Sequence, residues 1–216
     1  MAALRRTNRE IEVKLRISDV DEVLRNLKKI GARFESRVLE QNTLFDTPDS
    51  AFRGSGRLLR IRTETIAPRN PNSSLAPPRA NSVSRTVLTA KAPAPAKSAA
   101  ASRYKEKLER ELVVRNPARW LQVFSDLGLR PGFRYEKFRT TLRIPGLALI
   151  LDLDETPAGV FLELEGSPRA IDKAARALGF SPSDYYRGTY WDVYAADCRR
   201  HGRTLRNMVF HSRKSR

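Results

Sequence analysis

The chain has 216 residues, enough for one large domain or two small ones with a substantial apolar core. The single cysteine, Cys198, excludes a disulfide framework and a four-cysteine metal site. The longest purely apolar stretch, residues 147–151, is too short for a membrane-spanning helix, so we expect no membrane association. The N-terminal residues show no apolar core of a secretory signal, so we expect a cytoplasmic protein.

The formal net charge is +17, and most of the surplus lies in two segments without any acid. Residues 65–103 carry six basic residues, and residues 199–216 carry seven. The stretch at about 66–103 is rich in Pro, Ala and Ser, which predicts a flexible insertion in one domain spanning residues 1–198. Residues 199–216 are interpreted as a basic, disordered tail, a candidate contact for nucleic acid or polyphosphate.

Hydrophobic periodicity, caps and turn residues define the expected elements. In chain order they predict strand 9–17, a helix between Ser18 and Gly31, strands 39–46, 57–64, 85–91 and 104–114, a helix from Asn116 to Gly128, strands 134–144, 147–155 and 160–166, a helix from Ser167 to Gly179, and a helix over 189–200. Eight strands at hairpin spacing with flanking helices predict an α+β fold built on one antiparallel sheet or an eight-stranded β-barrel.

Charged residues alternate with apolar ones along these strands. In the first strand, Glu10, Glu12 and Lys14 share one face, and apolar residues occupy the other. The same pattern recurs at Arg60 and Arg62; at Thr89 and Lys91; at Lys105, Lys107, Glu109 and Glu111; at Lys137 and Arg139; at Asp152 and Asp154; and at Glu163 and Glu165. A solvated face normally mixes in Thr, Ser, Asn and Gln, which are sparse here.

The three long amphipathic helices must bury their apolar stripes. If they cover the apolar face of the sheet, the charged face lines an interior, and an eight-stranded barrel can hold one small ligand. Unpaired buried charges are costly, so such an interior needs complementary ligands. Carboxylates prefer hard cations such as Mg²⁺ or Mn²⁺, and Arg and Lys bind phosphates. The pattern therefore predicts a metal–polyphosphate site.

Seven segments, in order, resemble the CYTH family, the triphosphate tunnel metalloenzymes. They are Glu10–Lys14 (E-x-E-x-K), Gln41–Asp49, Leu59–Arg62 (L-R-x-R), Leu88–Lys91 (L-T-x-K), Lys107–Glu111 (basic-x-E-x-E), Glu136–Arg139 (E-K-x-R) and Leu162–Glu165, the closing E-x-E. The resemblance covers about residues 9–195 and implies an eight-stranded antiparallel tunnel that takes a triphosphate along its axis.

The resemblance also implies roles for individual residues. Lys14, Arg60, Arg62, Lys91, Lys107, Lys137 and Arg139 would grip phosphates. Glu10, Glu12, Glu109, Glu111, Asp154, Glu163 and Glu165 would hold Mg²⁺ or Mn²⁺ or orient water, with Asp152 an alternative to Asp154. The candidates for the catalytic step are Lys137, Glu12 and Glu111. Some hydrolases of this family have Tyr where Leu44 stands, supporting a lysine equivalent to Lys137, and Leu44 cannot take that role.

Three functions follow from these residues. The first is a metal-dependent triphosphatase acting on a small-molecule triphosphate, either inorganic tripolyphosphate or an organic one such as thiamine triphosphate. The second is a class IV adenylate cyclase, which would use the same charged motifs. The third, a non-catalytic polyphosphate- or RNA-binding module, is disfavoured because an anion binder gains nothing from paired acids. Trp191 is predicted to pack on the barrel wall or to close one end.

Overall fold

The computed structural model describes residues 8–66, 84–95 and 103–210. The elements are β1 (Asn8–Ile17), α1 (Val20–Lys29), β2 (Arg33–Asp46), α2 (Ala51–Gly54), β3 (Leu58–Ile66), β4 (Ser84–Pro93), β5 (Lys105–Val113), α3 (Pro117–Asp126), β6 (Arg130–Arg143), β7 (Leu149–Thr156), β8 (Gly159–Gly166), α4 (Pro168–Ala177), the 3₁₀ helix η2 (Pro182–Asp184) and α5 (Tyr190–Arg200). Within the described residues, no helix is long and apolar enough to cross a bilayer.

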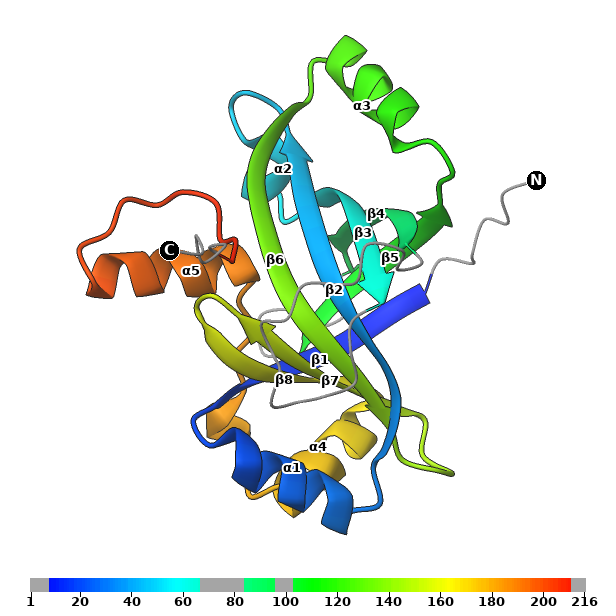
Figure 1. The fold of residues 1–216 in the computed structure, drawn as a ribbon, viewed down its shortest axis with the longest axis vertical. Coiled ribbons are helices and arrows are strands. Elements are labelled where there is room, and N and C mark those ends of the chain that lie inside the picture. Colours follow the sequence, from blue (N-terminus) through cyan, green and yellow to red (C-terminus); the bar gives the residue numbers. More distant parts are fainter. Residues whose placement is uncertain (1–7, 67–83, 96–102, 211–216) are drawn as a thin grey trace, which may run out of the picture.

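The eight strands close into one barrel in the order β1-β5-β4-β3-β2-β6-β7-β8, and every neighbouring pair is antiparallel. This confirms the predicted α+β barrel with flanking helices (Figure 1). Strands β2 and β6 are longer than predicted, 14 residues each. They stay paired across two irregularities in register, and Figure 1 shows them curving together along the whole barrel.

One part of the apolar core lies between the barrel wall and two helices. Val13 and Leu15 of β1 are fully buried and belong to the same cluster as Leu27 of α1 and Ile171 of α4. Figure 1 shows α1 and α4 lying side by side under β1, β7 and β8. Because side chains alternate along a strand, burying Val13 and Leu15 under helices turns Glu12 and Lys14 into the barrel.

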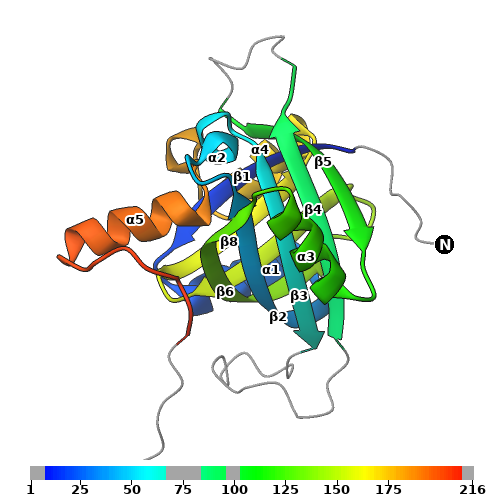
Figure 2. The ribbon, with the colours of Figure 1, turned by 90° about the horizontal axis from the view of Figure 1, so that it is seen from above.

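The remaining helices cover other parts of the barrel. Phe124 of α3 packs on Phe45 of β2, with ring centres 5.0 Å apart. Helix α5 extends away from the barrel, as seen in Figure 2, but its first residue, Tyr190, is buried beside Tyr135 and Phe161. Its N-terminus is capped by Thr189, whose side chain accepts the backbone N–H of the third helical residue. This cap places the start of α5 at one end of the interior.

A short helix that the sequence patterns did not predict follows β2. The Asp46 carboxylate accepts backbone N–H groups from Phe52 at 2.8 Å and from Arg53 at 3.0 Å. These bonds satisfy donors at the start of α2, a role that a capping side chain usually has. Asp46 therefore holds α2 against the end of β2, where it flanks the barrel opening.

The predicted strand inside the insertion is present as β4, and residues 67–83 and 96–102 lie outside the described residues. The predicted disordered tail is wrong for its first part. Helix α5 continues to Arg200, and Met208 is fully buried beside β6. The Met208 N–H donates to Arg134 O at 2.9 Å, and the Glu136 N–H donates to Met208 O at 2.8 Å. The buried Met208 side chain and these backbone hydrogen bonds hold in place a segment whose basic composition had predicted disorder. Residues 211–216 lie outside the described residues.

Candidate functional site

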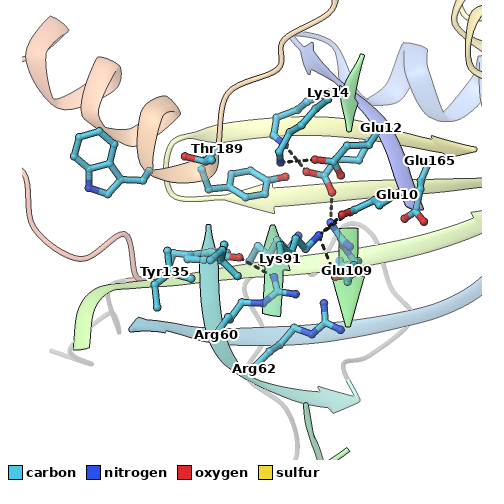
Figure 3. Close-up of a pocket in the computed structure, with 18 of the residues that line it drawn as sticks. Glu10, Glu12, Lys14, Arg60, Arg62, Lys91, Glu109, Tyr135, Glu165 and Thr189 are labelled. Carbon is cyan, nitrogen blue, oxygen red and sulfur yellow. Dashed lines mark hydrogen bonds and ion pairs between the residues drawn. The ribbon is translucent and has the colours of Figure 1, made fainter. Parts of the chain in front are cut away.

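The barrel encloses a cavity of about 320 Å³ lined by seven basic and six acidic side chains. The basic residues are Lys14, Arg60, Arg62, Lys91, Lys105, Lys137 and Arg139, and the acidic ones are Glu10, Glu12, Glu109, Glu111, Glu163 and Glu165. Figure 3 shows labelled members of this set pointing into the same space from opposite walls, with Lys14 and Glu12 facing Arg60 and Arg62. The resemblance implies roles for twelve of these thirteen residues, and the thirteenth, Lys105, is named only in the alternation.

On the wall formed by β1, β4 and β5, each lysine that lines the cavity contacts at least one carboxylate. Lys91 Nζ lies 2.6 Å from a Glu10 oxygen and 3.1 Å from Glu109 Oε1. Lys105 Nζ lies 2.5 Å from Glu12 Oε1. Burial favours a neutral Glu12, but Lys105 and Lys14 outweigh it and bring the pKa of Glu12 to about 2. Glu12 is therefore an ionised carboxylate fixed by its cations.

Two acids of the same region are less well compensated. The pKa of Glu10 is raised to about 7, chiefly by burial and also by the carboxylates of Glu12 and Glu109, against the opposing charge of Lys91. Burial, together with Glu10 and Glu12, also raises the pKa of Glu165 to about 7. Acids crowded in this way gain from a nearby cation.

These oxygen donors fit a hard divalent ion by type, since Mg²⁺ and Mn²⁺ prefer carboxylates. Across the described ranges, however, no three acidic, cysteine or histidine side chains stand close enough together to form a ready-made metal cluster. Most of the acids that line the cavity contact lysine or arginine instead, so an ion would take a carboxylate such as Glu10 away from Lys91.

The β6–β7–β8 wall centres on Asp154, which is fully buried behind the cavity lining. Its carboxylate lies 2.8 Å from Lys137 Nζ and accepts two bonds from Arg139, at 2.7 and 2.6 Å. It also accepts the Tyr190 hydroxyl at 2.5 Å. Four hydrogen bonds occupy this carboxylate, so Asp154 positions Lys137 and Arg139 instead of facing a ligand.

Asp152, the predicted alternative, lies 2.9 Å from Arg139 and accepts the Thr141 hydroxyl at 2.6 Å, and it does not line the cavity either. Glu163, in contrast, lines the cavity and forms ion pairs with Lys14 and Arg139. The two aspartates thus support the wall, whereas Glu163, like Glu165 on the same strand, presents a carboxylate to the interior.

Among the basic residues that line the cavity, Arg60 has the longest closest contact to a carboxylate. Its guanidinium is buried, donates to the Tyr135 hydroxyl at 3.1 Å and to the Thr89 hydroxyl at 3.2 Å, and lies 3.9 Å from Glu111. Its Nε has no hydrogen-bond partner among the described residues. A buried, charged donor with neutral partners and one free N–H is a suitable anchor for an anionic ligand.

Sequence reasoning missed two buried polar residues of β2. Glu40 is almost fully buried, with its carboxylate 3.5 Å from Lys137, 3.6 Å from Arg62 and 3.8 Å from Arg139. Both side-chain heteroatoms of Asn42 are buried without a hydrogen-bond partner in the described part of the chain. They stand two residues apart in a strand that ends at Asp46, so they carry the same alternation as the other strands, which could have revealed them.

On β5, the lysine expected to bind phosphate does not line the main cavity, and a neighbouring lysine does. Lys107, predicted to grip phosphate, does not line the main cavity, and its ammonium donates to Gly56 O at 2.8 Å. Lys105, two residues earlier on the same face, enters the cavity instead. Partial burial and the charges of Lys105 and Lys91 lower the pKa of Lys107, which marks an excess of positive charge at this end.

Leu44 lines the cavity, and two phenols from other elements lie nearby. Tyr135 of β6 accepts a bond from Arg60, and Tyr190 of α5 donates to Asp154. The Tyr190 ring lies 4.3 Å from Lys14 Nζ and 4.8 Å from Lys137 Nζ, measured to its centre. Trp191 also lines the cavity from the start of α5, so that the helix start closes part of one end.

Replacing Glu40 with Gln tests whether charge balance holds the barrel together. Burial opposes the charge of Glu40, but Lys137 and Arg139 outweigh it and hold the pKa of that carboxyl far below its usual range. Glu40→Gln leaves three buried cations short of an acid, so we expect the free energy of unfolding at pH 7 to fall by about 3 kcal/mol. Urea unfolding measures this loss.

The stabilising contribution of the Glu40 carboxylate depends on pH in a defined direction. A depressed folded-state pKa stabilises the native state above the unfolded pKa of about 4.3, and this contribution fades as pH falls below it. The difference between wild type and Glu40→Gln should therefore shrink below about pH 4. The control is Glu35→Gln. Glu35 lies on β2, as Glu40 does, and forms a half-exposed ion pair with Arg143, so this change should alter stability by less than about 0.5 kcal/mol. Equal effects of both variants would contradict the charge-balance account.

The comparisons with known proteins agree with this geometry. The family model described as CYTH domain matches residues 8–206. The Methanocaldococcus jannaschii protein named "Putative adenylate cyclase MJ0240" is 25% identical over 169 residues, covering 78% of this chain and 83% of the relative.

Two solved structures are similar in fold. The PH1012 protein from Pyrococcus horikoshii has a TM-score of 0.63 and 24% identity, covering 85% of this chain and 98% of its own. The HpAC1 protein from Hippeastrum has a TM-score of 0.53 and 19% identity, covering 91% of this chain and 97% of its own. With a family model spanning nearly the whole chain and a barrel whose charged residues face inward, this chain belongs to the CYTH domain family.

Proposed function

We propose that this protein is a metal-dependent triphosphatase that hydrolyses a small-molecule triphosphate inside the barrel. The observation that carries the proposal is the convergence of seven basic side chains on one cavity inside the barrel. A triphosphate carries several negative charges in a row, and a lined tunnel can contact all of them. The Hippeastrum relative, described as a putative adenylyl cyclase with a dominant triphosphatase activity, supports the same reaction class.

Phosphoryl transfer depends mainly on positioning and on neutralising charge. Arg60 and Arg62 on one wall, with Lys14 and Arg139 on the other, can hold the non-bridging oxygens and leave the terminal phosphorus open to water. The water oxygen forms a bond to this phosphorus as the bridging P–O bond breaks. Orthophosphate and the remaining diphosphate, inorganic from tripolyphosphate or organic from an organic triphosphate, leave, and the water loses a proton to solvent.

The carboxylates differ in their ability to orient the water. Glu12, with its pKa at about 2, is a weak base. Glu111 contacts Arg62 at 3.1 Å and the Thr89 hydroxyl at 3.1 Å, beside the proposed anchor Arg60, so we assign the water-orienting role to Glu111. Asp154 and Glu40 raise the pKa of Lys137 although burial opposes its charge, so Lys137 acts as a charged donor and not as a base.

A divalent ion, Mg²⁺ or Mn²⁺, would be held by the acids of β1, β5 and β8, namely Glu10, Glu12, Glu109, Glu163 and Glu165. When bound, such an ion supplies positive charge to the phosphate oxygens and to the leaving group. The crowding that raises the pKa of Glu10 and Glu165 to about 7 supports this assignment.

A class IV adenylate cyclase is the second candidate, and the name of the Methanocaldococcus jannaschii relative favours it. In that reaction the ribose 3′-oxygen bonds to the α-phosphorus and diphosphate leaves. The same basic and acidic side chains would serve both reactions, so the products decide between them.

Removing one acid from the lining tests the catalytic assignment. Glu163→Gln leaves Lys14 and Arg139 without their shared carboxylate, and Glu12→Gln does the same to Lys105. We expect turnover of tripolyphosphate to fall by at least about 100-fold in either variant, while circular dichroism shows a folded barrel. Glu106→Gln, outside the cavity lining, is the matched control. Full activity in Glu12→Gln and Glu163→Gln would refute the assignment.

Product analysis separates hydrolysis from cyclisation. The wild-type protein is incubated with tripolyphosphate or ATP in the presence of Mg²⁺ or Mn²⁺, and the products are separated by ion-exchange chromatography. We expect orthophosphate from both substrates, with no turnover after addition of a chelator. Cyclic AMP as the main product from ATP would establish the cyclase instead.

A further inference from the structure

One phenol from outside the barrel strands reaches the buried carboxylate behind the cavity lining. Tyr190 is the first residue of α5, is buried, and lines the charged cavity. Its hydroxyl donates to Asp154 Oδ2 at 2.5 Å. The same oxygen accepts a bond from Lys137 Nζ at 2.8 Å and one from the Arg139 guanidinium at 2.6 Å. Three donors therefore share one carboxylate oxygen.

The Tyr190 hydroxyl competes with these cations for the carboxylate. Burial and the negative charge of Asp154 raise the pKa of Tyr190 well above its ordinary value, so the phenol keeps its proton and donates it. A carboxylate oxygen offers about two lone pairs, so a third donor weakens the hold on the other two. The hydroxyl thus limits how tightly Asp154 holds the Lys137 ammonium, which leaves the other N–H groups of Lys137 to a ligand in the cavity.

The aromatic ring of Tyr190 faces two cations of the cavity. Its centre lies 4.3 Å from Lys14 Nζ and 4.8 Å from Lys137 Nζ. The ring is itself packed against Tyr135 and Phe161, at 5.7 and 5.8 Å between ring centres. Attraction to an aromatic face holds an ammonium group without neutralising its charge. The ring therefore restrains both lysines and leaves their charge available to an anion.

The chain just before Tyr190 is fixed to β1. The Tyr186 N–H donates to Lys14 O at 2.9 Å, and the Lys14 N–H donates to Tyr186 O at 3.2 Å. Thr189 caps α5, and its own backbone N–H donates to the Asp192 carboxylate at 2.7 Å. Tyr190 thus enters the barrel from an anchored turn, although the rest of α5 extends away from the barrel (Figure 2).

We propose that Tyr190 is a positioning residue for the lysines that bind the triphosphate. Its hydroxyl limits the hold of Asp154 on Lys137, and its ring keeps the ammonium groups of Lys14 and Lys137 directed into the cavity. The inference rests on the proposed function and gives Tyr190 no chemical step of its own. The role differs from that of Asp154, because a carboxylate offsets the charge of a lysine and a neutral phenol does not.

The affinity for tripolyphosphate reports the position of these lysines without requiring turnover. Isothermal titration calorimetry without added divalent ion gives the Kd of wild type, Tyr190→Phe and Tyr190→Leu. We expect Tyr190→Phe, which loses only the hydroxyl, to raise the Kd roughly three- to tenfold. Tyr190→Leu also loses the ring and should raise the Kd roughly tenfold or more. Tyr194→Phe, which removes a hydroxyl one turn later on α5 and outside the cavity lining, is the matched control and should leave the Kd unchanged.

A double-mutant cycle separates positioning from a general loss of structure. If the Tyr190 hydroxyl acts through Lys137, Tyr190→Phe should change the Kd less than about twofold in a Lys137→Met background. A purely structural tyrosine would have the same effect in both backgrounds, and that result would overturn the role. Circular dichroism checks that each variant is folded. If Lys137→Met does not fold, the cycle of Tyr190→Leu with Lys14→Met tests the contact through the ring, and full additivity there would overturn the role as well.

Turnover distinguishes this inference from the proposed function. With Mg²⁺, Tyr190→Phe should lower kcat for tripolyphosphate roughly tenfold, because a displaced Lys137 stabilises the developing charge less well, and Tyr194→Phe should not. Hydrolysis by the wild type, with Kd and kcat unchanged in Tyr190→Phe, would overturn the role of Tyr190 alone. Absence of turnover with every triphosphate would overturn the proposed function, while the calorimetric cycle would still test Tyr190.

Discussion

The structure depends on the mutual compensation of opposite charges buried in the barrel. Seven basic and six acidic side chains line one cavity, with Glu40, Asp152 and Asp154 behind them. Isolated charges in such a place would cost many kcal/mol, so each must find a partner. Asp154 shows the principle: Lys137, Arg139 and Tyr190 all contact it, and it stays fully buried.

This compensation also sets what a ligand must do. In the described residues most of the phosphate-binding candidates contact acids, as Lys91 contacts Glu10 and Glu109, and Lys14 contacts Glu163. The free energy of binding a polyanion is therefore only the difference between its own contacts with the basic residues and the ion pairs that it replaces. A divalent cation that engages the released acids would lower this cost, which gives a physical reason for the proposed metal dependence. Arg60, whose close partners are hydroxyls, is available from the start.

Much of the fold and of the site could be predicted because two-residue alternation is a local signal. Glu12 and Lys14 face the interior since Val13 and Leu15 must lie under helices, and the sequence shows both sets. Register is not local: Lys105 and Lys107 share a face, and only the pairing of β5 with β1 and β4 decides which of them enters the cavity. The packing of Met208 on β6 depends on one side chain in a basic run, and composition could not reveal it. The start of α5 at the cavity is likewise a tertiary contact.

The central claim is that the interior binds triphosphate through its basic side chains, and Arg60 is the residue that tests it most directly. Isothermal titration calorimetry would measure the affinity of wild type, Arg60→Met and Arg16→Met for tripolyphosphate with Mg²⁺; Arg16 is exposed on β1. Loss of one charge-assisted contact predicts a Kd that rises roughly 10- to 100-fold for Arg60→Met and stays unchanged for Arg16→Met. An unchanged Kd for Arg60→Met would show that tripolyphosphate binds elsewhere and would contradict the account.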